Sequence, residues 1–142
     1  MKVAIFSTKA YDREYLNCAN NLSPSPHELM FYEAPLNIQT VQLATKATAV
    51  CCFVNDHLDK PVLEELAHLG VQLIALRCAG FNQVDVATAQ KLGLYIARVA
   101  EYSPHAVAEH ALGLIMMLNR NLHRAHNRIR ENDYSLNGLL GF

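Results

Sequence analysis

The sequence has 142 residues, enough for one domain that buries about two-thirds of the surface of its unfolded chain. Hydrophobic residues make up 51% of it and charged residues 18%, a balance that excludes an intrinsically disordered chain. The formal net charge of −1 gives no electrostatic reason to expect nucleic acid or an anionic membrane surface as a partner.

Apolar runs alternate with polar, helix-like segments along the first hundred residues. The runs predict strands over residues 2–7, 28–32, 49–54, 72–76 and 94–99. The segments between them predict helices over residues 11–21, 37–46, 61–70 and 85–92. Ser103 as N-cap and Pro104 at the first helical position then open a long final helix, over residues 104–132.

This alternation of strands and helices predicts an α/β fold. The connections are short, which favours right-handed crossovers between parallel strands. We expect a flavodoxin-like five-stranded parallel sheet in the order 2-1-3-4-5, with helices on both faces and a long C-terminal helix. Ligands of such sheets bind beyond the carboxyl ends of the strands, so the loops after Phe53, Leu76 and Val99 should lie together at the binding edge.

Three features of these loops are candidates for ligand binding, each with a plain structural alternative. The Ala79–Gly80 turn could offer backbone N–H groups to a carboxylate, or Gly80 could merely permit the bend. Tyr102 could point its hydroxyl at the same ligand, or pack as a staple on the following helix. Phe53 could wall an apolar pocket, or belong to the core.

Motifs for a reactive centre or a cofactor do not occur. The six glycines form neither a G-x-G-x-x-G fingerprint nor a Walker A loop, so no cofactor-binding residue is predicted. His123 and His126 have the spacing of half a metal site, but no third ligand joins them. Glu109 and His110 are neighbours on a helix and point in different directions, so they form no catalytic dyad. We therefore predict no metal site and no catalytic residue in this chain.

The cysteines indicate the compartment. They stand at positions 18, 51, 52 and 78 without a CxxC pair, which predicts reduced, buried thiols in a cytoplasmic protein. The apolar N-terminal run is too short for the core of a signal peptide. The longest nearly apolar stretch, residues 106–118, is too short to cross a bilayer, so no membrane association is expected.

Several segments, in the right order, resemble the D-2-hydroxyacid dehydrogenases, most closely the bacterial fermentative NAD-dependent D-lactate dehydrogenases. The matching segments are FSTKAYD at 6–12, FVND at 53–56, PVLEEL at 61–66, ALRCAGFN at 75–82, VAEHA at 107–111 and LNR at 118–120. The resemblance covers nearly the whole chain and concerns the N-terminal substrate domain of the family. It implies a substrate-binding domain over residues 1–103, and an interdomain helix with the start of a linker over residues 104–142.

The resemblance also implies a function. In the family, amides matching Ala79 and Gly80 hold the carboxylate of a 2-oxo acid, while residues matching Tyr102 and Phe53 complete the pocket. The expected reaction is reduction of pyruvate by NADH to D-lactate in a homo-oligomer. The family's catalytic histidine, acid and arginine, and its NAD-binding domain, match no residue of this sequence. We therefore expect the isolated chain to be inactive.

Two other interpretations are open to the sequence. The chain could be a non-catalytic binding or dimerisation module, since the apolar residues of the final helix would lack part of their cover. Those residues are Leu114, Ile115, Met117 and Leu118. A flavodoxin-like receiver fits less well, because the first strand ends in Phe6–Ser7–Thr8–Lys9 rather than in acidic residues.

Overall fold

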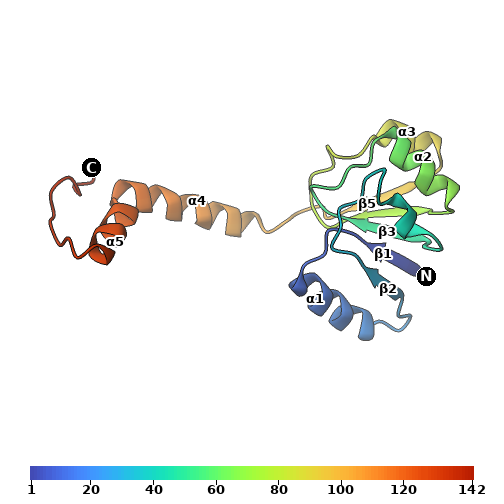
Figure 1. The fold of residues 1–142 in the computed structure, drawn as a ribbon, viewed down its shortest axis with the longest axis horizontal. Coiled ribbons are helices and arrows are strands. Elements are labelled where there is room, and N and C mark those ends of the chain that lie inside the picture. Colours follow the sequence, from blue (N-terminus) through green and yellow to red (C-terminus); the bar gives the residue numbers. More distant parts are fainter. The chain divides into compact units, whose positions relative to one another are not determined.

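A five-stranded parallel sheet in the order β2-β1-β3-β4-β5 organises the N-terminal part of the computed structural model (Figure 1). The structure describes residues 1–142 and divides into two units, Met1–Tyr102 and Ser103–Phe142. The strands are β1 (Lys2–Ile5), β2 (Glu28–Phe31), β3 (Ala49–Cys52), β4 (Leu73–Leu76) and β5 (Tyr95–Arg98). The predicted α/β class and strand order are confirmed.

Helices cover both faces of this sheet, as predicted. They are α1 (Ala10–Asn21), α2 (Lys60–His68) and α3 (Val86–Lys91), with α1 on one face and α2 and α3 on the other (Figure 1). The main core lies beneath α2 and includes the fully buried Leu63, Leu66 and Ile74. The α1 face has a smaller core around Ile5. α1 itself buries no residue completely, whereas α2 buries three.

Asn37 and Thr40 explain why the helix predicted over residues 37–46 is wrong. Only a short 3₁₀ turn, η1 (Val41–Ala44), forms there. The side-chain oxygen of Asn37 accepts the N–H groups of Gln39 and Thr40, and the Thr40 hydroxyl donates to the carbonyl of Pro35 at 2.6 Å. These local side-chain bonds give the backbone an alternative to a helix.

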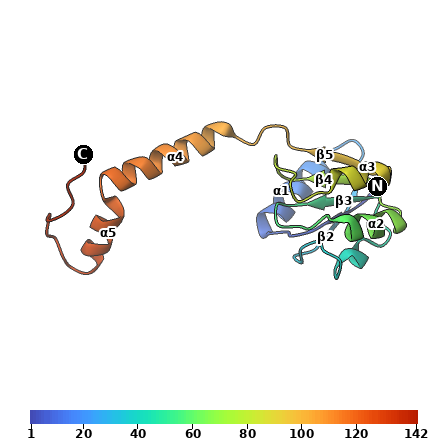
Figure 2. The same ribbon diagram turned by 90° about the horizontal axis from the view of Figure 1, so that it is seen from above.

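The helix predicted over residues 104–132 is wrong as a single element. The second unit holds α4 (Pro104–Asn119) and α5 (Leu122–Arg130), whose axes change direction between them (Figure 2). Asn121 lies between the two helices with a φ of 52°, a left-handed conformation that asparagine tolerates better than most residues. Ser103 precedes Pro104 as predicted, but its φ is 38° and its side chain makes no capping bond.

No helix of the structure is both long and apolar enough to cross a membrane.

The four thiols differ in their surroundings. Cys51, Cys52 and Cys78 are buried, whereas Cys18 on α1 is exposed, so the prediction of buried thiols is wrong for Cys18. Burial raises the pKa of Cys51 and raises that of Cys52 well above its ordinary value. The two strand thiols are therefore neutral in the folded chain.

Truncation of Leu63 to alanine should destabilise the chain by about 2–5 kcal/mol, because it opens a cavity in the core under α2. The matched control is Leu22→Ala, since Leu22 is 82% exposed and should change the unfolding free energy by no more than about 0.5 kcal/mol. Urea unfolding of both variants measures the difference. Equal effects would contradict the assignment of this core.

A thiol reagent at neutral pH should modify one thiol per folded chain promptly, and Cys18→Ser should abolish that reaction. The buried thiols should react only after unfolding. An unfolded chain ionises its thiols above their ordinary pKa of 9.0, while Cys51 and Cys52 stay protonated when folded. The free energy of unfolding should therefore fall as the pH rises above that value, which chemical unfolding at a series of pH values would detect.

Candidate functional site

The loops that follow β3, β4 and β5 meet at the carboxyl edge of the sheet and enclose an open pocket of about 260 Å³. Its lining residues are Phe53, Val54, Arg77, Cys78, Ala79, Gly80 and Tyr102. The four residues that the sequence analysis singled out thus lie around one pocket. Its walls are mainly apolar, and the lining residues with polar side-chain groups are Arg77, Cys78 and Tyr102.

The turn after β4 leaves two backbone donors free. Its carbonyl groups are engaged, since that of Ala79 accepts from Arg98 Nη1 at 2.9 Å and that of Gly80 accepts from the Cys78 thiol at 3.2 Å. The N–H groups of Ala79 and Gly80 have no acceptor within the chain. Two adjacent unpaired N–H groups at a pocket can bind an anionic oxygen.

Gly80 is not required by the shape of this turn. Its φ lies outside the left-handed region, and a Cβ at this position would have no heavy atom within 4 Å. Gly70, at the end of α2, differs because its φ of +86° is one that side chains disfavour. The predicted alternative, in which Gly80 merely permits the bend, therefore lacks a conformational basis.

Asp85 occupies the start of α3, close to where the sequence predicts the helix to begin. Its carboxylate accepts from the Thr88 amide at 3.0 Å and from the Thr88 hydroxyl at 2.6 Å. These bonds from Thr88 hold the pKa of Asp85 below its ordinary value. The N-terminus of α3 is thus already served by its own carboxylate, and the unpaired amides are those of the preceding turn.

Phe53 and Tyr102 frame the pocket in different ways. Phe53 is half-buried, so it is both a wall of the pocket and a residue in contact with the interior. Tyr102 is 69% exposed, and its hydroxyl makes no hydrogen bond within the chain. That hydroxyl is available to a ligand.

Three charged residues were not among the functional candidates from the sequence: Arg77, which lines the pocket, and Asp12 and Asp56, which interact with the lining residues Arg77 and Phe53. Arg77 lies over the Phe53 ring, with 5.3 Å from its guanidinium carbon to the ring centroid, and its Nε is 3.4 Å from a carboxylate oxygen of Asp12. Asp56 is completely buried and accepts from the Phe53 amide at 2.6 Å. Asp56 is the last residue of the FVND segment that carried part of the resemblance, and its place in that segment, in the loop after β3, was the available signal.

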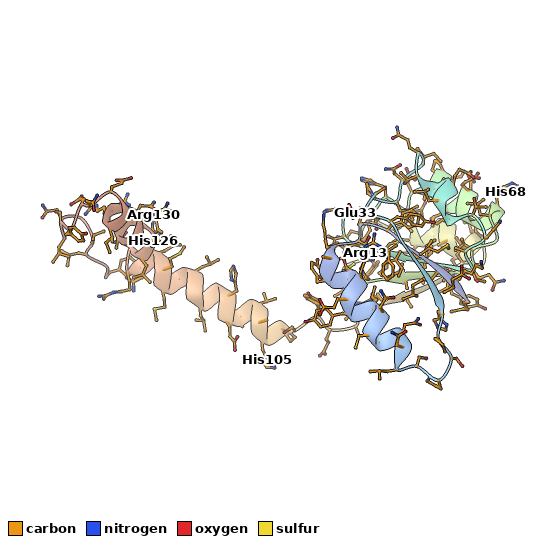
Figure 3. The ribbon with its side chains drawn as sticks, turned by 60° about the horizontal axis from the view of Figure 1, so that its bottom comes forward. Arg13, Glu33, His68, His105, His126 and Arg130 are labelled. Carbon is orange, nitrogen blue, oxygen red and sulfur yellow. The ribbon has the colours of Figure 1, made fainter.

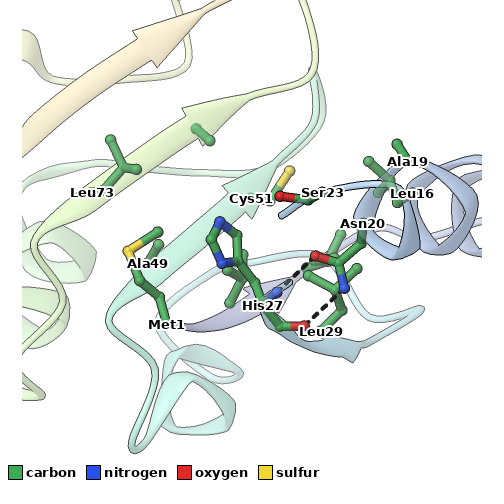
Figure 4. Close-up of a pocket in the computed structure, with 13 residues that line it drawn as sticks. Met1, Leu16, Ala19, Asn20, Ser23, His27, Leu29, Ala49, Cys51 and Leu73 are labelled. Atoms are coloured by element: carbon green, nitrogen blue, oxygen red, sulfur yellow. Dashed lines mark hydrogen bonds between the residues drawn. The ribbon is translucent and has the colours of Figure 1, made fainter. Parts of the chain in front are cut away.

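A larger pocket of about 380 Å³ lies on the α1 face of the sheet (Figure 4). Its floor consists of strand residues such as Ala49, Cys51 and Leu73. Asn20 and the backbone of His27 exchange two hydrogen bonds at its border, and the His27 side chain also lines it. This pocket is mainly apolar and lacks a pair of adjacent unpaired backbone amides, so we place the candidate site at the smaller one.

The residues present do not form a metal or dinucleotide site. No group of three or more histidine, cysteine, aspartate or glutamate side chains is arranged to hold a metal ion. Two of the histidines lie on different helices, His105 on α4 and His126 on α5 (Figure 3). The Glu33 carboxylate is paired with Arg13 at 4.0 Å and is not part of a cluster of metal-ligating side chains. The glycines lie too far apart in sequence to cradle a pyrophosphate.

Comparison with known proteins gives consistent matches. Residues 3–136 match the catalytic domain of the D-isomer specific 2-hydroxyacid dehydrogenases. A 2-hydroxyacid dehydrogenase homolog of Haemophilus influenzae is 54% identical over the full chain, and the D-lactate dehydrogenase of Escherichia coli is 51% identical. The chain covers 42% and 43% of these two relatives.

Solved structures agree with these matches. The apo structure of the Escherichia coli D-lactate dehydrogenase aligns with the whole chain at a TM-score of 0.90, and the chain covers 44% of it. The pyruvate reductase of Chlamydomonas reinhardtii aligns at a TM-score of 0.89 with 42% identity, and the chain covers 41% of it. The chain thus spans less than half the length of its relatives and belongs to the D-isomer specific 2-hydroxyacid dehydrogenase family.

Proposed function

We propose that residues 1–103 are the substrate-binding domain of an NAD-dependent D-2-hydroxyacid dehydrogenase that reduces pyruvate to D-lactate. The observation that carries this proposal is that Ala79 and Gly80, whose amides are unpaired, line one pocket together with Phe53 and Tyr102. The similarity to enzymes named D-lactate dehydrogenase and pyruvate reductase supports the choice of a small 2-oxo acid.

In this proposal the substrate carboxylate accepts hydrogen bonds from the amides of Ala79 and Gly80. Charge-assisted bonds of this kind are stronger than neutral ones, and they fix the acid in one orientation. The Tyr102 hydroxyl is a further donor at the same pocket, and the Phe53 ring flanks the methyl group of pyruvate. These groups bind and orient the substrate.

The chain does not supply the remaining chemistry. Arg77 is the only guanidinium that lines the pocket, and it is already committed to the carbonyl of Phe6 at 3.1 Å and to Asp12. It is therefore a poor candidate for polarising the substrate carbonyl. No residue of this chain is assigned as proton donor or NAD ligand. The nicotinamide cofactor supplies the hydride in this family, and its binding residues belong to the rest of the enzyme.

Residues 104–142 are proposed as the interdomain helix and the start of a linker. No residue of α4 or α5 is buried within this unit, and Leu114, Ile115 and Leu118 are 43–60% exposed. Such an apolar helix surface supports a second candidate function, self-association into a homo-oligomer or a dimerisation module. Three buried thiols fit a reducing compartment such as the cytoplasm.

The purified 142-residue chain should show no oxidation of NADH in the presence of pyruvate, since it lacks residues for the nicotinamide cofactor and the proton donor. The same sample should bind oxamate, a pyruvate analogue, with NMR shift changes at the amides of Ala79 and Gly80. Binding without turnover supports the proposal. Turnover would contradict the inactivity of this chain, and self-association without oxamate binding would favour the dimerisation module.

Gly80→Ala separates ligand binding from folding. The added methyl group has space and no backbone strain, so the melting temperature should stay the same or rise slightly. Gly80 lines the pocket and its amide is a proposed carboxylate ligand, so we expect the added methyl group to crowd the ligand and weaken oxamate binding. The matched control is Gly70→Ala, which should lower the melting temperature because of its positive φ and leave binding unchanged. Normal oxamate binding by Gly80→Ala would count against the proposed carboxylate site.

A further inference from the structure

The Asp56 carboxylate joins three segments of chain at the carboxyl edge of the sheet. One oxygen accepts the Ser7 hydroxyl at 2.6 Å and the Leu36 amide at 2.8 Å, and the other accepts the Phe53 amide at 2.6 Å. Ser7 follows β1, Leu36 lies in the connection after β2, and Phe53 follows β3. A single side chain thus sets the spacing of three neighbouring loops.

The burial of Asp56 has an energetic cost. The residue has 0% exposure and forms no ion pair, so only the three donors compensate the loss of hydration. A neutral residue would avoid that cost. A carboxylate, however, can accept at both oxygens at once and makes stronger hydrogen bonds than a neutral acceptor. The arrangement gives up hydration energy in return for a rigid loop junction.

Arg77 holds the same phenylalanine from the ring side. Its guanidinium lies within the distance of a cation–π contact of the Phe53 ring. The guanidinium is itself fixed, because its two terminal nitrogens donate to the carbonyls of Phe6 and Ser7 at 3.1–3.3 Å. Asp12 provides the opposite charge, and the side chains of both ion-pair partners are only 12–13% exposed.

We propose that Asp56 and Arg77 are positioning residues that hold Phe53 as a fixed wall of the substrate pocket. Asp56 accepts the backbone N–H of Phe53, and Arg77 contacts the Phe53 ring. The proposal rests on the proposed function, since it assigns a purpose to a wall of that pocket. Neither residue needs to react with the substrate. Their effect is preorganisation, because a side chain that is already fixed loses no further conformational entropy when the ligand binds.

The test compares Asp56→Asn with Thr8→Val in the 142-residue chain. Asparagine keeps the size of Asp56 but has only one side-chain oxygen, which we expect to face the two donors Ser7 and Leu36, so its NH2 group faces the Phe53 amide and the bond to Phe53 is lost. Thr8 is buried to a similar degree, and its hydroxyl donates to the Tyr32 carbonyl and makes no hydrogen bond with Asp56 or Phe53. Thr8→Val therefore serves as a destabilised control that leaves Phe53 held.

Two measurements follow from this design. NMR relaxation of a ¹³C-labelled Phe53 ring reports its mobility without any ligand, and we expect greater mobility in Asp56→Asn than in the wild type or Thr8→Val. Oxamate titration measures ligand binding at the pocket. The shift changes of the Ala79 and Gly80 amides at one oxamate concentration should fall at least about twofold in Asp56→Asn, and only in that variant. Arg77→Lys, which loses the planar group but keeps the charge, gives a second variant if Asp56→Asn does not fold.

An equally rigid Phe53 ring in the folded variants would overturn the proposal, as would the same mobility in Thr8→Val. A mobile ring with unchanged oxamate shifts would overturn it too, because the wall would then not serve the pocket. Failure of the wild-type chain to respond to oxamate at Ala79 and Gly80 would instead overturn the proposed function. In that case the ring relaxation still decides whether Asp56 and Arg77 hold Phe53.

Discussion

All five strands of the sheet run in the same direction, and the other features of the first unit depend on this constraint. Parallel pairing requires a crossover connection between successive strands, and three of the four connections carry an α-helix over a face of the sheet. The same pairing brings every strand-to-helix loop to one edge. Residues separated by many positions, such as Phe53, Gly80 and Tyr102, therefore surround one pocket without any direct pairing in sequence.

Charged groups are concentrated just beneath this edge. Asp12, Asp56 and Arg77 are buried or nearly so, and each serves backbone or side-chain groups of the loops. Burial of charges rarely increases stability compared with apolar packing. In exchange, the loops have one defined arrangement, since few alternative positions would satisfy the same donors and acceptors. These residues therefore fix the geometry of the loops more than they stabilise the sheet.

The sheet was predictable because five apolar runs alternate with polar, helix-like segments along the first hundred residues. The pocket residues were predictable from their place after strands, strengthened by the family resemblance. The errors lie where a single side chain determines the local backbone conformation. Asn37 and Thr40 replace a helix by a turn, and Asn121 interrupts a helix through one left-handed residue. The role of Asp56 depends on partners 20 and 49 positions away, which sequence spacing does not reveal.

The unequal cover of the two sheet faces has a consequence for local unfolding. α1 buries no residue completely, whereas α2 buries three, so detaching α1 exposes less apolar surface. Transient openings should therefore begin at α1 and expose its amides to hydrogen exchange before those of α2. Asp12 belongs to α1 and leaves with it, so each opening deprives Arg77 of its counter-ion. The order of the pocket wall is thereby linked to the sheet-covering helix that buries the fewest residues.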